Sequence, residues 1–338
     1  MSNPYGLSFG IFGGHSLEDT IAIVQKAESA GLEACWIFED YFYGGAFSTA
    51  TACALSTHKI QIAIGVINPF TRHPALSAME AASLDALSHG RLIVGMGGSN
   101  KGWIQDKAGI PFVKPIQAAA EAAEIIRQLV NTRHTHYNGE VFRTGPIDLE
   151  FETYRSDMPV YLGVKGPKAL FKAGQMADGV VLSSCTSIPY ISYAKEHIRA
   201  GAEAAGRDPS QLKMAAYFPT AVNDNETLAR DAVRPYLAKF IGIHGYHPIM
   251  FEAGLTEEII RPFKEALIQG KTAQVIPLVT DDIVDKLAIA GNAAYCKDKL
   301  AAINAPVCPC PSHLSFPASL PWSWSTPWSA SFLPELHQ

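Results

Sequence analysis

The 338-residue chain has little of what marks membrane, secreted or nucleic-acid-binding proteins. No stretch approaches the roughly 18 uninterrupted apolar residues that a membrane-spanning helix needs. The start, Met1 to Tyr5, lacks the basic and apolar regions of a signal peptide. A formal net charge of −5 does not favour a nucleic-acid surface. We therefore expect a cytoplasmic protein without a membrane or nucleic-acid partner.

Cysteine is also scarce, with six in the chain, and only Cys308 and Cys310 lie close together. Such spacing does not predict a disulfide framework, so the others are expected to be reduced packing residues, as at Cys35, Cys53 and Cys185. His244 and His247 have a spacing that some metal sites use, but no third ligand accompanies them, and we expect no metal. With 48% hydrophobic residues, the chain can build a large core.

One pattern repeats along most of the chain: a short apolar run, a turn rich in Gly, Asn or Asp, and a segment with helical periodicity. The predicted strands lie at about residues 5–12, 33–38, 60–66, 91–97, 159–164, 178–183 and 213–221. Seven or eight such units in a chain of this length favour a (β/α)8 barrel, an α/β fold. A doubly wound sheet would usually show G-x-G-x-x-G after its first strand, and residues 10–15 lack it. In a barrel, the residues that directly follow the strands form the site.

Two strand exits carry polar side chains suited to chemistry. The third predicted strand runs into Asn68-Pro-Phe-Thr-Arg-His73, where Asn68 could contact a ligand and His73 could transfer a proton. Plain turn chemistry is the alternative, with His73 only holding the turn. After the second strand, Glu39 and Asp40 stand among aromatic rings, which suits a planar ligand and proton transfer. The alternative there is an acid pair at a helix start.

Glycine-rich turns follow the fourth and fifth strands, where backbone N–H groups could approach a ligand closely. The candidate ligand-binding residues in these turns are Gly97, Gly98 and Ser99, and Gly163, Gly166, Pro167 and Lys168. The second set predicts an anion site at a helix N-terminus with Lys165 nearby, or else a tight turn with solvated lysines. Ser183 and Ser184 follow the sixth strand; they could reach a ligand, but we expect them to cap the next helix, which begins near Pro189.

The order and spacing of three motifs resemble the bacterial luciferase-like superfamily. They are the Asn-Pro-Phe-Thr-Arg-His-Pro turn, the Gly-Arg-Leu-Ile-Val-Gly-Met-Gly strand, and the Gly-Pro-Lys and Ala-Asp-Gly-Val pair. The resemblance is strongest to the branch with methylenetetrahydromethanopterin reductase, which uses coenzyme F420, and it extends from about residue 5 to about residue 303. It implies a barrel enzyme that transfers a hydride between bound F420 or a flavin and a small organic substrate.

The same resemblance implies positions for the cofactor. A bulge with a non-prolyl cis peptide is expected around Gly65 and Val66, the phosphate group at Gly163 to Lys168, and the cofactor beside Gly97 and Gly98. We also expect a homo-oligomer. Two other functions stay open: an FMN-dependent monooxygenase that uses oxygen, and a non-catalytic flavin-binding or degenerate member.

The chain departs from the reductase pattern at its expected acids. Phe12 and Asn100 stand where the resemblance leads us to expect carboxylates, and Glu39-Asp40 replaces an expected Asp-His pair. These carboxylates are the groups most easily assigned to protonating a pterin nitrogen. We therefore expect a substrate other than methylenetetrahydromethanopterin.

The barrel domain is expected over residues 1–303, with insertions at about 132–157 and 242–274. The first insertion would roof the substrate pocket or support an oligomer interface, and the second would be a substrate lid. Residues 304–338 are rich in Pro, Ser and Trp, which a central strand or helix could not absorb, so the eighth β/α unit is expected to be atypical or lost. One hypothesis is a reading-frame shift; the alternative is a genuine tail with imperfect closure.

Overall fold

The computed structural model describes residues 7–9, 16–39, 42–304 and 314–315, and the chain divides into two compact units. Of the described residues, unit 1 comprises 7–9, 16–39, 42–182, 197–216 and 314–315. Unit 2 comprises 183–196 and 217–304. Within the described ranges, no helix has both the length and the apolar character needed to cross a membrane.

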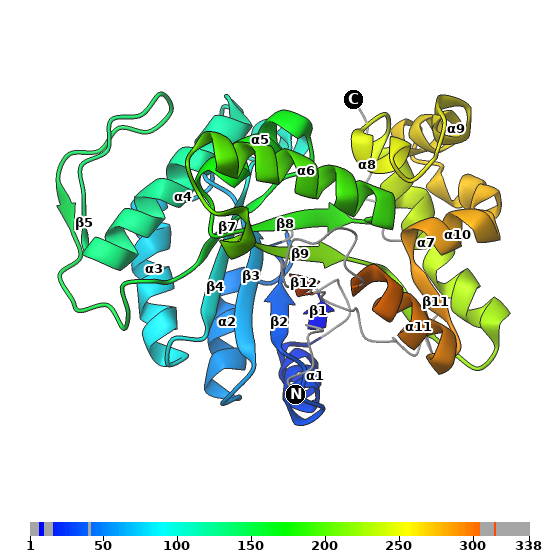
Figure 1. The fold of residues 1–338 in the computed structure, drawn as a ribbon, viewed down its shortest axis with the longest axis horizontal. Helices are drawn as coiled ribbons and strands as arrows, with labels where there is room; N and C mark the ends of the chain where they lie inside the picture. The colour runs from blue at the N-terminus through cyan, green and yellow to red at the C-terminus, as the bar shows by residue number, and fades with distance from the viewer. Residues whose placement is uncertain (1–6, 10–15, 40–41, 305–313, 316–338) are drawn as a thin grey trace. The chain divides into compact units, whose positions relative to one another are not determined.

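An eight-stranded sheet forms the centre of unit 1 (Figure 1). Its strands, in spatial order, are β1 (Leu7–Phe9), β2 (Ala34–Ile37), β3 (Gln61–Ile67), β4 (Leu92–Gly97), β7 (Val160–Gly163), β8 (Gly179–Ser184), β9 (Lys213–Tyr217) and β12 (Leu314–Ser315). Each pairing with an assigned register is parallel. This sheet of sequential parallel strands with covering helices confirms the predicted α/β, TIM-barrel-like class.

The strand predicted over 213–221 is two strands. β9 ends at Tyr217, and β10 (Thr220–Val222) pairs with β11 (Ile289–Gly291) in a separate parallel ribbon of unit 2. Pro219 lies between them, and because it has no N–H it cannot continue a ladder as donor. The eighth strand of the main sheet is β12, whose described residues, 314 and 315, pair with Met214 and Ala215 of β9.

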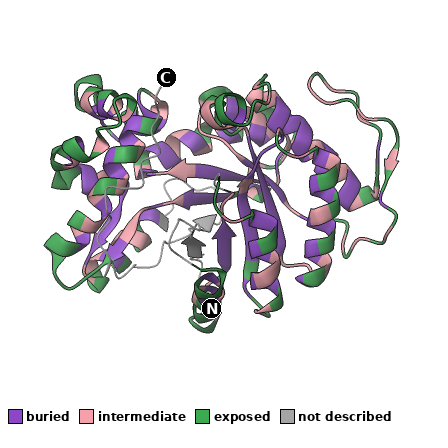
Figure 2. Ribbon diagram, turned by 180° about the vertical axis from the view of Figure 1, so that it is seen from behind, coloured by how far each residue is buried: buried purple, intermediate pink, exposed green. Residues whose placement is uncertain are grey.

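Helices cover the sheet of unit 1: α1 (Leu17–Ser29), α2 (Ala46–Leu55), α3 (Pro74–Leu87), α4 (Pro115–Thr132), α5 (Pro167–Met176), the π-helical turn η1 (Gly102–Lys107) and the 3-10 turn η2 (Pro209–Gln211). α6 (Ile188–Ala204) runs from unit 2 into unit 1. α2 and α3 lie side by side against β3 and β4. Buried residues concentrate on the strands and on the helix faces turned toward them (Figure 2). Continuous apolar runs are typical of strands covered on both faces.

Two charged side chains fix the start of β3. The Arg91 guanidinium donates to the carbonyls of Ala54, Thr57 and Ile60 at 2.8 to 3.1 Å. The Glu28 carboxylate accepts from the three successive N–H groups of residues 58–60. These bonds satisfy backbone groups that would otherwise be left without partners at the strand start.

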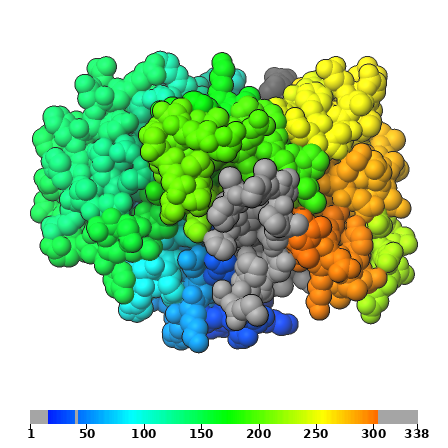
Figure 3. Space-filling model, in the orientation of Figure 1, coloured from blue at the N-terminus to red at the C-terminus, as the bar shows by residue number. Residues whose placement is uncertain are grey.

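The first predicted insertion contains an antiparallel pair, β5 (His134–Thr135) and β6 (Ile147–Asp148), beside α4 (Figure 1). In the space-filling view, this stretch of the chain lies at the green-cyan left edge (Figure 3). The buried carboxylate of Glu121 on α4 accepts the N–H groups of Glu140, Val141 and Phe142 at 2.8 to 2.9 Å. A Cβ on Gly139 would lie only 2.4 Å from this carboxylate. Glu121 therefore ties the turn of the insertion to the barrel.

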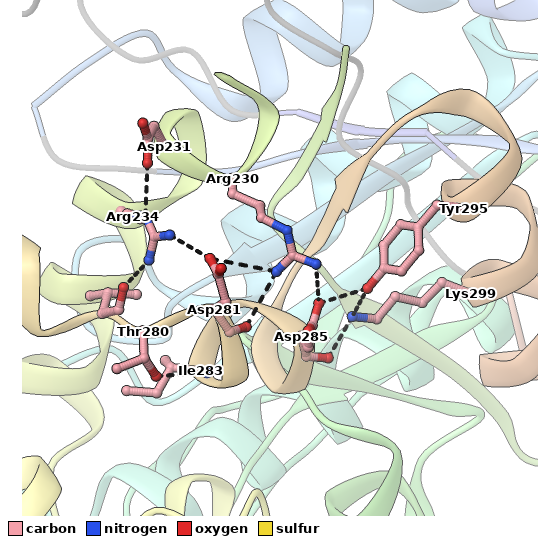
Figure 4. A network of polar contacts seen from close by, with 10 residues as sticks. Arg230, Asp231, Arg234, Thr280, Asp281, Ile283, Asp285, Tyr295 and Lys299 are labelled. Carbon is pink, nitrogen blue, oxygen red and sulfur yellow. Dashed lines mark hydrogen bonds and ion pairs between the residues drawn. The ribbon is translucent and has the colours of Figure 1, made fainter. Parts of the chain in front are cut away.

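Unit 2 is mainly helical. Its elements beyond the β10–β11 ribbon are α7 (Glu226–His244), α8 (Pro248–Phe251), α9 (Glu257–Ile268), the 3-10 segment η3 (Thr272–Leu278), α10 (Asp281–Leu287) and α11 (Ala293–Asn304). Arg230 on α7 bridges Asp281 and Asp285 on α10, and Tyr295 on α11 donates to Asp285 at 2.7 Å (Figure 4). This network joins three helices.

The cysteines within the described ranges are Cys35, Cys53, Cys185 and Cys296, and all four are buried free thiols. Burial raises the pKa of the Cys35 thiol well above its usual range, so this group packs as a small apolar side chain. Cys308 and Cys310 lie outside the described residues. In the part of the chain that the structure describes, no three potential ligands gather to hold a metal ion.

Candidate functional site

The exit of β3 is a bulge built on a cis peptide bond. The bond between Gly65 and Val66 is cis, which confirms the predicted non-prolyl cis peptide. The register between β3 and β4 shifts between Ile64 and Ile67 at the same place. Gly65 and Val66 together stand opposite the single residue Gly95, and a bulge of this kind changes the direction in which a side chain such as Val66 points.

The Val66 side chain occupies space that three glycines leave open. A Cβ on Gly97 would lie 2.5 Å from Val66 Cγ2, and one on Gly163 would lie 2.8 Å from Val66 Cγ1. A Cβ on Gly95 would meet the same Cγ1 at 2.9 Å. The predicted site residues Gly65, Val66, Gly97 and Gly163 are thus brought together. The sequence did not single out Gly95, because nothing in a single strand indicates which neighbour approaches it.

Asn68 supports the turn that follows the bulge. Its side-chain oxygen accepts the N–H groups of Phe70 and Thr71 at 2.8 and 3.1 Å, and its amide donates to the Thr71 hydroxyl at 2.8 Å. The side chain is buried. Asn68 therefore holds the shape of the β3 exit, where the cis peptide lies.

His73 takes the turn-holding role that the sequence left open. It is the N-cap of α3, and its Nδ1 accepts the N–H of Ala75 at 3.2 Å. Because Nδ1 is the acceptor, a neutral imidazole carries its proton on Nε2. The ring meets Phe142 edge-on, with centroids 6.0 Å apart.

Glu39 lies in a cleft of about 440 Å³ between α2 and α3. Burial raises the pKa of its carboxyl, and the nearby Arg72 guanidinium acts in the opposite direction. Arg72 in turn approaches Glu80, with Nη1 and Oε2 3.1 Å apart. None of the residues in the predicted glycine turns is among the described residues that line this cleft. The cleft therefore does not bring Glu39 together with those turns. Asp40 lies outside the described residues.

At the exit of β4, the local structure explains why residue 98 is glycine and shows an unusual backbone at Ser99. A Cβ on Gly98 would lie 3.0 Å from the Pro115 carbonyl oxygen, so glycine lets the start of α4 approach. Ser99 has a left-handed backbone with φ of 56°. The Asn100 side chain accepts the N–H of Trp103 at 3.0 Å, which uses its oxygen in the turn before η1.

At the exit of β7, the predicted anion site has the expected local form. Gly166 is the N-cap of α5 without a side-chain hydrogen bond, and Pro167 is the first helical residue. The first N–H groups of a helix lack intrahelical partners, which favours an anion there. Lys168 is exposed in the first turn. Lys165 is half-buried, and burial lowers the pKa of its ammonium group.

Ser184 at the end of β8 does not cap the next helix, so that expectation is wrong. The N–H of Tyr190 is accepted by Ser187, which lies closer to the start of α6. Ser184 instead accepts a hydrogen bond from the Tyr236 hydroxyl at 2.9 Å, and its carbonyl lies 3.0 Å from His244 Nε2. A carbonyl can only accept, so Nε2 carries a proton. The sequence could not indicate Tyr236, because the two residues are 52 positions apart.

Known proteins resemble this chain over most of its length. A family model described as luciferase-like monooxygenase matches residues 5–307. The 5,10-methylenetetrahydromethanopterin reductase of Methanopyrus kandleri is 31% identical over 293 residues, covering 82% of this chain and 83% of the relative. That of Archaeoglobus fulgidus is 33% identical over 274 residues, covering 80% and 81%. The solved structure of the F420-dependent tetrahydromethanopterin reductase of M. kandleri gives a TM-score of 0.83 at 27% identity, covering 94% of this chain and 93% of that one.

Proposed function

Because the chain belongs to the luciferase-like monooxygenase family, we propose that it transfers a hydride between bound coenzyme F420 and a small organic substrate. The chain is an enzyme of this family, and the superfamily and reductase branch indicated by its motifs are confirmed. When bound, the coenzyme supplies the ring that carries the hydride. The residues described above supply its support, its orientation and a proton.

The observation that carries the proposal is the seating of Val66 among three glycines. Gly95 and Gly97 of β4 and Gly163 of β7 each leave room for its isopropyl group. This packing holds the bulge at the exit of β3 against β4 and β7. A flat ring needs a fixed surface of this kind to rest on. Gly65 and Val66 would hold one face of the ring, with Asn68 fixing the turn behind them.

The anionic part of the coenzyme would be held at the start of α5. Gly163, Gly166, Pro167 and Lys168 form the turn there, and α5 begins without a side-chain cap. N–H groups at a helix start and a nearby lysine together suit a phosphoryl group. Gly97, Gly98 and Ser99 would border the coenzyme from β4.

For proton transfer we propose Glu39, Asp40 and His73 as candidates, and Glu39 lines a cleft whose described lining does not include the glycine turns. Burial raises the Glu39 pKa, so a larger fraction of this carboxyl stays protonated at a given pH than in an exposed glutamate. His73 caps α3 with Nδ1 and would act through Nε2. Asn100 caps a turn at the place where an acid is expected, which supports a substrate other than methylenetetrahydromethanopterin.

Anaerobic titration of the full chain with F420, and separately with FMN, tests the proposal. We expect saturable F420 binding that weakens about 10- to 100-fold in Lys168→Ala, since a charge-assisted hydrogen bond contributes about 1.5 to 3 kcal/mol. Lys172→Ala, one turn further along α5, removes the same charge and is expected to bind as the wild type does. If folded protein takes up neither coenzyme, the proposal is wrong.

The same titration separates the alternatives. Preferential FMN binding, followed by oxygen consumption with reduced FMN, would favour the monooxygenase. F420 binding without oxidation of the reduced coenzyme by a panel of imines and carbonyl compounds would favour a non-catalytic member. Methylenetetrahydromethanopterin belongs in that panel, and we expect it to be a poor substrate.

A further inference from the structure

Between β4 and α4 the chain forms one closed surface loop. The loop begins at Ser99 and ends at Lys114, the residue before α4. A Cβ on Gly98 would lie 3.0 Å from the Pro115 carbonyl oxygen, so the two ends of the loop lie side by side. Surface loops of roughly 6 to 16 residues with adjacent ends are called Ω-loops, and they are frequently functional. Residues 99–114 have this form, and we call them the β4 loop.

The β4 loop has an internal structure of its own. Its first part is the π-helical turn η1, in which the side chain of Ile104 is buried. The N–H of Ile110 donates to the carbonyl of Ile104 at 3.0 Å, and that of Ala108 donates to the carbonyl of Trp103 at 3.1 Å. π-helical turns are rare and often lie at functional sites. Because these bonds close within the loop, it can keep its shape while it moves as a body.

The contacts between the β4 loop and the rest of the chain are sparse. Within the described residues, η1 has no extensive packing against another helix or strand, and residues 105–109 are all exposed. Each end of the loop has a left-handed backbone at a residue other than glycine, with φ of 56° at Ser99 and 46° at Lys114. Such conformations are costly and occur at ligand clamps and switch regions. Sparse packing and strained ends are properties of a segment that can open.

The last part of the β4 loop is closed onto the β3 exit by an aromatic contact. The ring of Phe112 packs against that of Phe70, with centroids 5.2 Å apart and planes inclined at 47°. Phe70 donates its N–H to Asn68, so Phe112 covers the turn that follows the cis peptide. Lys114 also pairs with Glu140 of the β5–β6 insertion, but both side chains are exposed, so this ion pair holds the loop only weakly. The ring contact is therefore the stronger of these two latches.

We propose that the β4 loop is a lid over the coenzyme, which opens to admit the ring and closes when Phe112 returns to Phe70. The lid directly follows Gly97 and Gly98, where the coenzyme is placed above, so its role rests on the proposed function. Rotation at the two ends moves the loop away from the β3 exit while β4 and α4 stay in place. Closure of such a loop excludes water from the reacting ring and retains the coenzyme.

Trypsin cleavage after Lys107, in the exposed part of the loop, measures opening in the full chain without coenzyme. Phe112→Ala should be cleaved there about 2- to 10-fold faster than the wild type, because the aromatic contact that holds the loop is lost. Val113→Ala is the matched control: this neighbouring side chain is 52% exposed, and its loss should leave the rate unchanged. Equal rates in the two variants would overturn the proposal. Faster cleavage of Phe112→Ala after Lys239 on α7 as well would also overturn it, because Phe112 would then support the whole fold.

Coenzyme binding gives a second measurement. Saturating F420 should slow cleavage of the wild type after Lys107 at least about tenfold, since a ligand bound to the closed form lowers the open population. In stopped-flow experiments F420 should leave Phe112→Ala about 2- to 10-fold faster than it leaves the wild type or Val113→Ala. F420 that binds without slowing cleavage would overturn the lid and leave the proposed function intact. Folded protein that takes up no F420 would refute the proposed function, and the lid with it.

Discussion

Gly97→Ala tests whether the Val66 side chain occupies the space in front of β4. The added methyl group would lie 2.5 Å from Val66 Cγ2, against a normal carbon contact of about 3.5 to 4.0 Å. Gly97 does not have a left-handed backbone, so alanine brings no conformational strain of its own. Val66 must therefore move by about 1 Å or rotate, and overpacking of this kind costs about 1 to 3 kcal/mol.

Val66→Ala shows whether that cost comes from Val66. It removes both γ-methyl groups, and the nearest atoms to the new methyl at residue 97 are then the residue 66 Cβ at 3.4 Å and the Gly163 carbonyl oxygen at 3.6 Å. Both are ordinary contacts. The double variant should therefore be about 1 to 2 kcal/mol more stable than the sum of the single effects predicts. Urea unfolding of the four proteins gives the free energies.

Gly145→Ala is the control, because a Cβ there meets no atom within 4 Å and the backbone is not left-handed. It should change stability by less than about 0.5 kcal/mol. If Gly97→Ala is as stable as this control, or if the two effects simply add, Val66 does not fill the space that Gly97 leaves. In that case the proposed support for the ring loses its basis. F420 titration of Gly97→Ala is expected to show weaker binding, since the bulge must shift.

Three further predictions concern the framework. Arg91→Lys should lower the free energy of unfolding by about 2 to 4 kcal/mol, because one ammonium cannot satisfy the separate carbonyls of Ala54, Thr57 and Ile60; a loss below 1 kcal/mol in urea unfolding would contradict this. Burial alone would raise the Glu121 pKa, but hydrogen bonds from Phe142, Gln117, Val141 and Glu140 outweigh it and lower that pKa. The stabilisation that the Glu121 carboxylate gives to the folded state is therefore complete above the unfolded-state pKa and is lost as pH falls through the folded-state pKa. The difference in free energy of unfolding between the wild type and Glu121→Gln should thus become smaller from neutral to acidic pH. A difference that stays constant with pH would refute this. Arg230→Ala should lower the free energy of unfolding by at most about 1 kcal/mol, since its partners Asp281 and Asp285 are largely exposed. We therefore expect it to destabilise the protein less than Arg91→Lys does, and thermal melting that shows the reverse order would contradict this.

Much of the fold could be predicted because buried parallel strands have continuous apolar runs. The strands predicted at about 60–66, 91–97 and 178–183 are β3 at 61–67, β4 at 92–97 and β8 at 179–184. The cis peptide could be placed only through the family resemblance, since no local pattern distinguishes Gly65 from other strand glycines. The prediction of one strand over 213–221 was wrong, and Pro219 in the sequence could have indicated the break between β9 and β10.

The site was harder to predict, because several residues there depend on neighbours far along the chain. Gly97 and Gly163 could be identified as candidates because each lies at the end of a strand. Their contact with Val66, which requires both to be glycine, could not be predicted. Gly98 is explained by Pro115, and Ser184 by Tyr236. Such pairings form only when strands and helices pack, so a single sequence shows the residue types without the partner.

Closure of the predicted barrel depends on its eighth strand. In a closed barrel each strand has two neighbours, and the described part of the eighth strand, β12, pairs with β9. That described part aligns two residues with β9, whereas β3 and β4 pair over four aligned positions and a bulge. The sequence of residues 306–321 contains closely spaced prolines, and a proline lacks the N–H that a strand donates to its neighbour. Sequencing the locus decides whether these prolines belong to the protein: an intact frame through the stop codon would remove the hypothesis of a reading-frame shift, and a shifted frame would restore alternating Val or Ala codons suited to a strand.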